Sequence, residues 1–174
     1  VVTPWIDSQK NLVQGARIKY VKADLSKPLD KDLKQVLAER TSVLHFAWKR
    51  GPKLNDVVQE NLYMVDQLMD GLKDKQRFFF ASSVAASPNA ESIYGKSKYL
   101  VGKKVSERGG VVVSLGLVVD ETPTGAYKSL VSLASKLPVA VRASGTSFSV
   151  LPVGTSELMK TLEEAVVGSV KSGS

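Results

Sequence analysis

Apolar and polar residues alternate along this chain in two patterns. Short apolar runs typical of buried strands occur at 18–23, 42–47, 77–81 and 111–119. Residues 1–2 are predicted to end a further strand. Apolar residues spaced three or four positions apart predict amphipathic helices at 28–40, 55–72, 94–108, 124–137 and 156–167. Strands that alternate with helices predict an α/β protein with a mostly parallel sheet covered on both faces.

The helix at 94–108 is expected to end at Gly109 and Gly110, since glycine favours helix ends. The sequence shows no internal repeat, linker or low-complexity segment before its end. One domain is therefore predicted at 1–168, and 169–174 is predicted to be a flexible tail.

The composition narrows the class of protein. The chain has 174 residues, of which 43% are hydrophobic and 24% charged, as is ordinary for a globular domain. It has no cysteine, so disulfides are excluded and no metal site is predicted. No apolar run approaches the roughly 20 residues of a membrane span, and no signal peptide is recognised. A cytoplasmic protein that binds no membrane is expected.

The formal net charge is +7, which favours anionic ligands such as nucleotides. The basic residues are scattered along the chain. They form no block interleaved with aromatic residues, so nucleic acid is not expected as a partner.

Candidate chemistry centres on Tyr94 and Lys98, which share one face of a predicted helix. A lysine ammonium beside a phenol favours the phenolate, which suits proton transfer. Ser82 and Ser83 end the preceding apolar run, where a hydroxyl could hold a substrate oxygen. Such a trio is typical of a dehydrogenase or epimerase. The alternative is a half-exposed helical tyrosine beside a solvated lysine.

Together with four further stretches, this trio resembles an extended or atypical short-chain dehydrogenase/reductase of the NAD-dependent epimerase/dehydratase group. The matching stretches, in order, are 21–25, 43–48, Asn61, 80–83, Tyr94 with Lys98, and 113–118. The resemblance implies a Rossmann-like, doubly wound, mostly parallel sheet.

The resemblance also implies roles for these residues. Tyr94 would be the general acid/base, Ser83 would hold the reacting oxygen, and Lys98 would lower the tyrosine pKa and bind the nicotinamide ribose. Asp24 would bond the adenine amine. Further contacts to NAD or NADP are implied for Leu25, Phe46, Ala47, Trp48, Asn61, Ala81, Ser82 and Leu117. The substrate would be a small molecule, a sugar or nucleotide sugar, and two copies would pair through 55–72 and 94–108.

One departure from the family is large. The family opens with a strand and a Gly-x-x-Gly-x-x-Gly turn that binds the pyrophosphate, and this sequence has no such motif. The sheet is therefore expected to lack its first strand and helix, with a break between the strands at 18–23 and 42–47. A non-catalytic descendant of the fold that binds a nucleotide or a protein partner is the alternative function.

Other interpretations remain for single residues. Residues 90–97 nearly form a phosphate-binding P-loop, which would indicate a nucleotide hydrolase, but Ala90 stands where the first glycine is needed. His45, the one histidine, is expected to be a core residue. Asp24 could instead cap a turn, and Asn61 could be an ordinary polar residue of a helix face.

Overall fold

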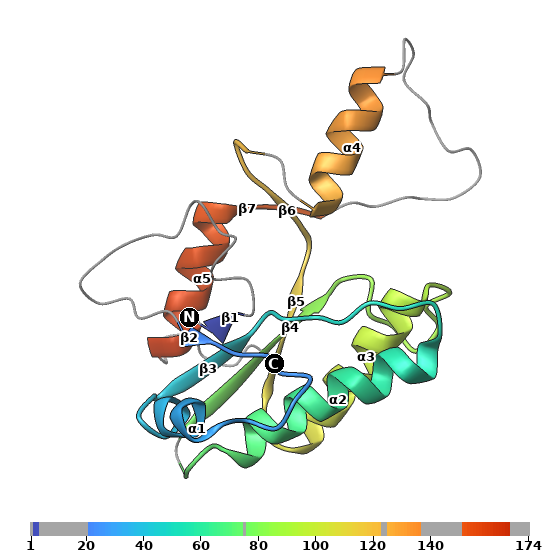
Figure 1. The fold of residues 1–174 in the computed structure, drawn as a ribbon. Coiled ribbons are helices and arrows are strands. Elements are labelled where there is room, and N and C mark those ends of the chain that lie inside the picture. Colours follow the sequence, from blue (N-terminus) through green and yellow to red (C-terminus); the bar gives the residue numbers. More distant parts are fainter. Residues whose placement is uncertain (1, 4–20, 75, 123–124, 137–150, 168–174) are drawn as a thin grey trace.

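The central sheet has three parallel strands, in the order β3 (Ser42–His45), β4 (Arg77–Ser83) and β5 (Val111–Leu115). The computed structural model describes residues 2–3, 21–74, 76–122, 125–136 and 151–167 (Figure 1). In the register of the strands, Phe80 lies between His45 and Val112. The expected α/β class with parallel strands is confirmed.

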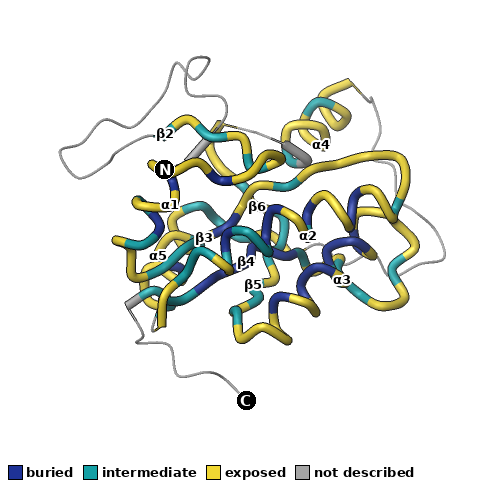
Figure 2. The backbone as a smooth tube through the Cα atoms, turned by 60° about the horizontal axis from the view of Figure 1, so that its bottom comes forward, coloured by how far each residue is buried: buried dark blue, intermediate teal, exposed yellow. Residues whose placement is uncertain are grey.

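Three helices form the core with one face of this sheet: α1 (Lys31–Ala38), α2 (Leu54–Asp70) and α3 (Ile93–Glu107). Side chains alternate along β4, so Phe78 and Phe80 face these helices. The buried cluster comprises Leu29, Leu33, Leu37, Val65, Leu68, Phe78, Phe80, Val101 and Val105. Figure 2 shows the most deeply buried backbone where α2, α3 and the sheet meet.

The opposite face of the sheet meets α5 (Thr155–Val167). Phe79 and Ala81 lie there beside Leu162. The Arg77 guanidinium donates hydrogen bonds to the carbonyls of Ala165 and Val166 at the end of α5. Both faces of the sheet are thus covered by helices, as the sequence predicts.

Two short parallel pairs lie outside the central sheet. β1 (Val2–Thr3) pairs with β2 (Val21–Lys22), and β6 (Leu117–Val119) pairs with β7 (Pro152–Gly154). Within the described ranges, neither pair hydrogen-bonds to β3–β4–β5. Among the described residues, β2 and β3 therefore belong to different sheets.

The single strand predicted at 111–119 is wrong, because the chain changes sheets at Gly116. A Cβ atom on Gly116 would lie 1.9 Å from the Leu151 carbonyl oxygen, and Leu117 donates its N–H to that oxygen at 2.8 Å. The approach to Leu151 interrupts β5 and starts β6. A strand around 152–154 was not predicted, since three residues carry too little pattern.

The predicted helices agree with α1, α2, α3, α4 (Gly125–Lys136) and α5, with boundary differences. The largest is at α1, which begins at Lys31 because the Asp30 side chain accepts the Leu33 N–H at 2.7 Å. Pro28 therefore precedes the helix and is not in its first turn. Gly109, with φ +80°, follows α3 as expected. The tail at 169–174 and residues 18–20 lie outside the described residues. None of the described helices has the length and apolar character needed to cross a membrane.

Candidate functional site

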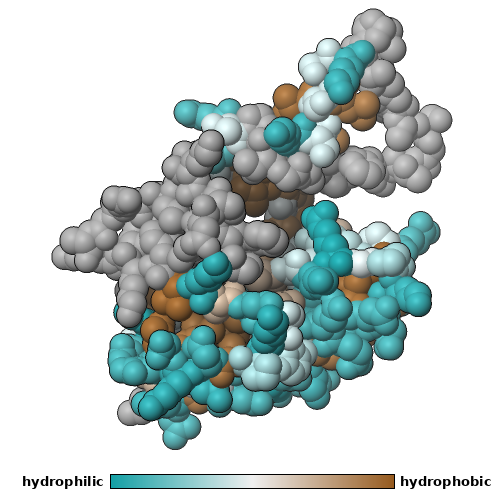
Figure 3. Space-filling model, in the orientation of Figure 1, coloured by the Kyte–Doolittle hydropathy of each residue, from teal (hydrophilic) through white to brown (hydrophobic). Residues whose placement is uncertain are grey.

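Ser83 and Tyr94 border one cavity of about 670 Å³. Ser83 is the last residue of β4, and Tyr94 lies in the first turn of α3 with 36% of its surface exposed. Trp48 and Leu117 line the same cavity. Figure 3 shows hydrophobic surface in the hollow between α4 and the body formed by α2 and α3. Four of the residues expected at the site are thus brought together.

The start of α3 explains how Tyr94 reaches the end of β4. Ser92 caps the helix by accepting the Gly95 N–H at 3.0 Å. A Cβ atom at Gly95 would lie 2.4 Å from the Ala85 carbonyl oxygen, so only glycine lets the loop after β4 cross the helix this closely. The Ser83 hydroxyl accepts the Ala85 N–H at 3.2 Å and fixes the beginning of that loop.

Lys98 lies one turn after Tyr94 and is buried, with 3% of its surface exposed. Its ammonium donates to the Ala81 carbonyl oxygen at 2.6 Å and lies 3.9 Å from the centre of the Trp48 ring. Burial, and secondarily the charge of Arg50, lowers the pKa of Lys98 to about 8. Lys98 does not line the cavity itself. It contacts the ring of Trp48, and Trp48 lines the cavity.

Trp48 joins the lysine to the tyrosine. Its ring meets Tyr94 edge to face at 6.4 Å, and the Arg50 guanidinium lies 5.5 Å from the centre of the Tyr94 ring. The order Lys98, Trp48, Tyr94, Arg50 is a continuous series of cation and ring contacts. Arg50 was not singled out from the sequence, and only its position near the Trp48 motif could have indicated it.

Asn61 fixes the loop that carries Trp48 and Arg50. It is fully buried in α2, and its amide accepts the Lys49 N–H at 3.0 Å and donates to the Lys49 carbonyl at 2.9 Å. The same amide nitrogen donates to the Val57 carbonyl at 2.6 Å. All described bonds of Asn61 are thus to backbone, so it positions the wall of the cavity.

His45 is a buried core residue, as expected. Its ring stacks with Phe78 at 6.0 Å and with Phe80 at 6.2 Å. Burial, followed by the charge of Lys98, lowers its pKa to about 4, so the ring is neutral at pH 7. Its Nε2 atom has no partner among the described residues.

The residues expected near adenine, Asp24 and Leu25, are not in the lining of the Tyr94 cavity. The Asp24 carboxylate accepts from the Ser26 hydroxyl at 2.6 Å and from the Ser26 N–H at 3.0 Å, bonds that lower its pKa. Asp24 thus stabilises a turn, which was its alternative interpretation. The Leu25 carbonyl accepts from the Gln67 amide at 2.6 Å, which ties this turn to α2.

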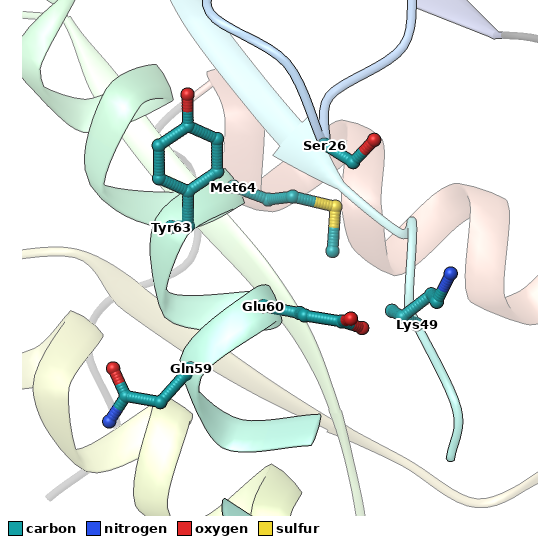
Figure 4. A pocket seen from close by; sticks show the side chains of 6 residues that line it. All are labelled: Ser26, Lys49, Gln59, Glu60, Tyr63 and Met64. Atoms are coloured by element: carbon teal, nitrogen blue, oxygen red, sulfur yellow. The ribbon is translucent and has the colours of Figure 1, made fainter. Parts of the chain in front are cut away.

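A second cavity, of about 490 Å³, opens beside this turn (Figure 4). It is lined by Ser26, Lys49, Gln59, Glu60, Tyr63 and Met64. In Figure 4 the Glu60 side chain extends from α2 toward Lys49. The sequence did not indicate this cavity, because its wall is the polar side of α2.

The other residues expected to contact the cofactor are not brought to either cavity. Phe46 and Ala81 line the depression on the α5 side of the sheet, and Ser82 is buried in β4. Over the residues that are described, no three His, Asp or Glu side chains are grouped so as to hold a metal ion.

The fold and cavity define an α/β protein with a parallel sheet and a Ser–Tyr cavity at the strand ends. No family model matches the sequence, and no curated protein matches it. A solved structure, the capsular polysaccharide assembling protein CapF from Staphylococcus aureus, is similar with a TM-score of 0.49 and 14% identity over 83% of this chain. The chain spans 41% of that protein.

Proposed function

We propose that this protein is an NAD- or NADP-dependent oxidoreductase or epimerase of the extended or atypical short-chain dehydrogenase/reductase type, with a Rossmann-like sheet. It would act on a substrate hydroxyl or carbonyl through Ser83, Tyr94 and Lys98. The observation that carries the proposal is the meeting of Ser83 and Tyr94 at one cavity, although they come from different elements. Lys98 lies directly behind that wall.

The chemistry of these side chains supports a proton-transfer site. The Tyr94 oxygen, in its phenolate form, would take the proton of a substrate alcohol as it is oxidised, and in the reverse direction the Tyr94 hydroxyl would give its proton to the oxygen of a carbonyl as it is reduced. The Ser83 hydroxyl would hold the same oxygen by a hydrogen bond and orient it toward Tyr94. When bound, the nicotinamide would accept or donate the hydride.

The residues of the cavity fit the nicotinamide end of a dinucleotide in part. Tyr94 is open to the cavity and could contact a ribose hydroxyl. Lys98 would reach the ribose only after the Trp48 ring moves, since that ring lies 3.9 Å from the ammonium. At the other end, the proposal places the adenine at the turn of Asp24 and Leu25, next to Ser26 in the lining of the second cavity. Both Ser26 bonds go to the Oδ1 atom of Asp24, so its Oδ2 atom would accept from the adenine amine.

Tyr94→Phe tests the proposal, because it removes only the hydroxyl. The reduced nicotinamide is followed optically with a panel of alcohols, carbonyl compounds and nucleotide sugars. We expect turnover to fall at least a hundredfold, within the range typical of general acid–base catalysis. Tyr99→Phe, on the same helix, is the matched control and should keep wild-type turnover. Activity of Tyr94→Phe within about tenfold of wild type would contradict the role of Tyr94.

One observation favours a second candidate, a non-catalytic protein that binds a small ligand in the cavity. The Lys98 ammonium already bonds to the Ala81 carbonyl and is covered by Trp48. Calorimetric titration with NAD and NADP separates the two candidates. Saturable binding that Tyr94→Phe weakens supports the oxidoreductase, and absence of binding to either cofactor supports the second candidate.

A further inference from the structure

We propose that the ligand of the Tyr94 cavity is an apolar hydroxy or oxo acid, in place of a sugar. Its carboxylate would lie at Arg50, and its apolar body would lie between α4 and the body of the protein. The description of this ligand as a substrate rests on the proposed function. The inference that the ligand binds in this cavity does not depend on the proposed function.

The walls of the cavity are mainly apolar. Lining side chains are contributed by Val57, Val84, Ile93, Leu117, Leu130 and Leu151. Several of them are unusually exposed for their type: Val84 by 48%, Leu130 by 50% and Leu151 by 58%. Concave surface with exposed apolar side chains is typical of a site that a ligand covers.

The polar groups in the lining are too few for a sugar. A sugar ring needs a hydrogen-bond partner for almost every hydroxyl that it buries, and each missing partner is costly. The described lining contains no Asp, Glu, Asn or Gln side chain. Two of its three hydroxyls already accept backbone N–H groups, Ser83 from Ala85 and Ser92 from Gly95.

The charge of the lining favours an anion near the reacting atom. Arg50 is the charged residue among the described lining side chains, and the buried ammonium of Lys98 lies behind Trp48. The guanidinium lies 5.5 Å from the centre of the Tyr94 ring. A ligand with its carboxylate at Arg50 could therefore place a hydroxyl or carbonyl oxygen at the Tyr94 hydroxyl if only a few bonds separate the two groups. A hydroxy acid whose hydroxyl lies close to its carboxylate has this spacing.

Trp48 fluorescence provides the test, because Trp48 lines the cavity. The measurements use the Trp5→Phe variant as the background, because this substitution removes the other tryptophan of the sequence. The probes are 3-hydroxydecanoate, its uncharged methyl ester and UDP-glucose. The acid and the ester are titrated below the concentrations at which they form micelles, and UDP-glucose is titrated over the same range. We expect saturable binding of the acid, weaker binding of the ester, and no binding of UDP-glucose in the same range.

Two variants locate the acid. Arg50→Gln should weaken binding of the acid about fivefold and leave the ester unchanged, as for a partly screened charge pair. Leu130→Asn should weaken acid and ester alike by about tenfold through lost apolar contact. Arg40→Gln, an exposed arginine after α1, is the matched control and should change nothing. Circular dichroism checks that each variant is folded.

Tighter binding of UDP-glucose than of the acid would overturn the inference, as would equal affinity of the acid for wild type and Arg50→Gln. The proposed function fails separately, when Tyr94→Phe keeps its turnover. Arg50-dependent binding of the acid would then still identify the ligand class.

Discussion

The Lys98 ammonium lies 3.9 Å from the centre of the Trp48 ring and 2.6 Å from the Ala81 carbonyl oxygen. The lysine on which the proposed chemistry depends is therefore held against β4 and separated from the cavity by an aromatic side chain. Whether Trp48 can move determines whether the lysine reaches a ligand.

Replacing Trp48 with alanine should uncover Lys98. We expect NAD or NADP to bind more tightly to Trp48→Ala, measured by calorimetry, because the ammonium becomes accessible to a ribose. The variant should also lose stability, by about 3 kcal/mol, since a large ring that packs on Phe80 is removed. Phe46→Ala, an exposed aromatic residue two positions earlier, is the control. An unchanged cofactor affinity in the folded Trp48→Ala variant would show that the ring is no barrier.

The buried ammonium should make stability depend on pH in the alkaline range. Burial lowers the pKa of Lys98 from 10.5 to about 8, so between these values the unfolded chain binds the proton that the folded chain has lost. The free energy of unfolding should therefore rise as pH increases from about 8 to 10.5, by roughly 3 kcal/mol at most. Urea unfolding of wild type and Lys98→Met at several pH values measures this. This rise in the free energy of unfolding should be missing in Lys98→Met. If the free energy of unfolding depended on pH identically in wild type and Lys98→Met, the burial of a charged lysine would be contradicted.

Loss of the Asn61 amide should disturb the loop that carries the cavity residues Trp48 and Arg50. In Asn61→Ala, the N–H and the carbonyl of Lys49 lose their partner, at a cost of about 2–4 kcal/mol. Because the same loop carries Trp48 and Arg50, Trp48 fluorescence should also change. Asn55→Ala, an exposed position of α2, should alter neither. A stable Asn61→Ala protein with unchanged fluorescence would mean that the loop holds its shape without Asn61.

Two glycines of α3 should respond oppositely to alanine. Gly95→Ala would place a Cβ atom 2.4 Å from the Ala85 carbonyl oxygen, which forces the loop after Ser83 away from Tyr94. We expect a loss of stability of more than about 2 kcal/mol together with loss of activity. Gly102→Ala meets ordinary contacts of 3.5 Å or more and should be neutral or stabilising, since alanine favours helix by about 1 kcal/mol. Equal thermal melting temperatures for the two variants would contradict the close approach at Gly95.

The sequence predicted the features that repeat along the chain. Each helix and each strand of the central sheet has enough residues for its period to be recognised, and Gly109 and the Ser82–Ser83 pair mark element ends by their own chemistry. The short pair β6 and β7 could not be predicted, because the pairing depends on the approach of Leu151 to Gly116, two residues 35 positions apart in the chain.

For the candidate site, the sequence determined that Tyr94 and Lys98 share a helix face and that Ser83 ends a strand, since spacing along regular elements fixes both. The tertiary structure alone decided which of them is open to a ligand. Trp48 covers Lys98 because Asn61 holds the loop that carries Trp48. The Asp24 carboxylate accepts a hydrogen bond from the Ser26 hydroxyl within a turn. The apolar character of the cavity also arises only in three dimensions, where Leu130 and Leu151 line the same cavity as Tyr94. Such contacts join residues far apart in the chain, and local periodicity carries no information about them.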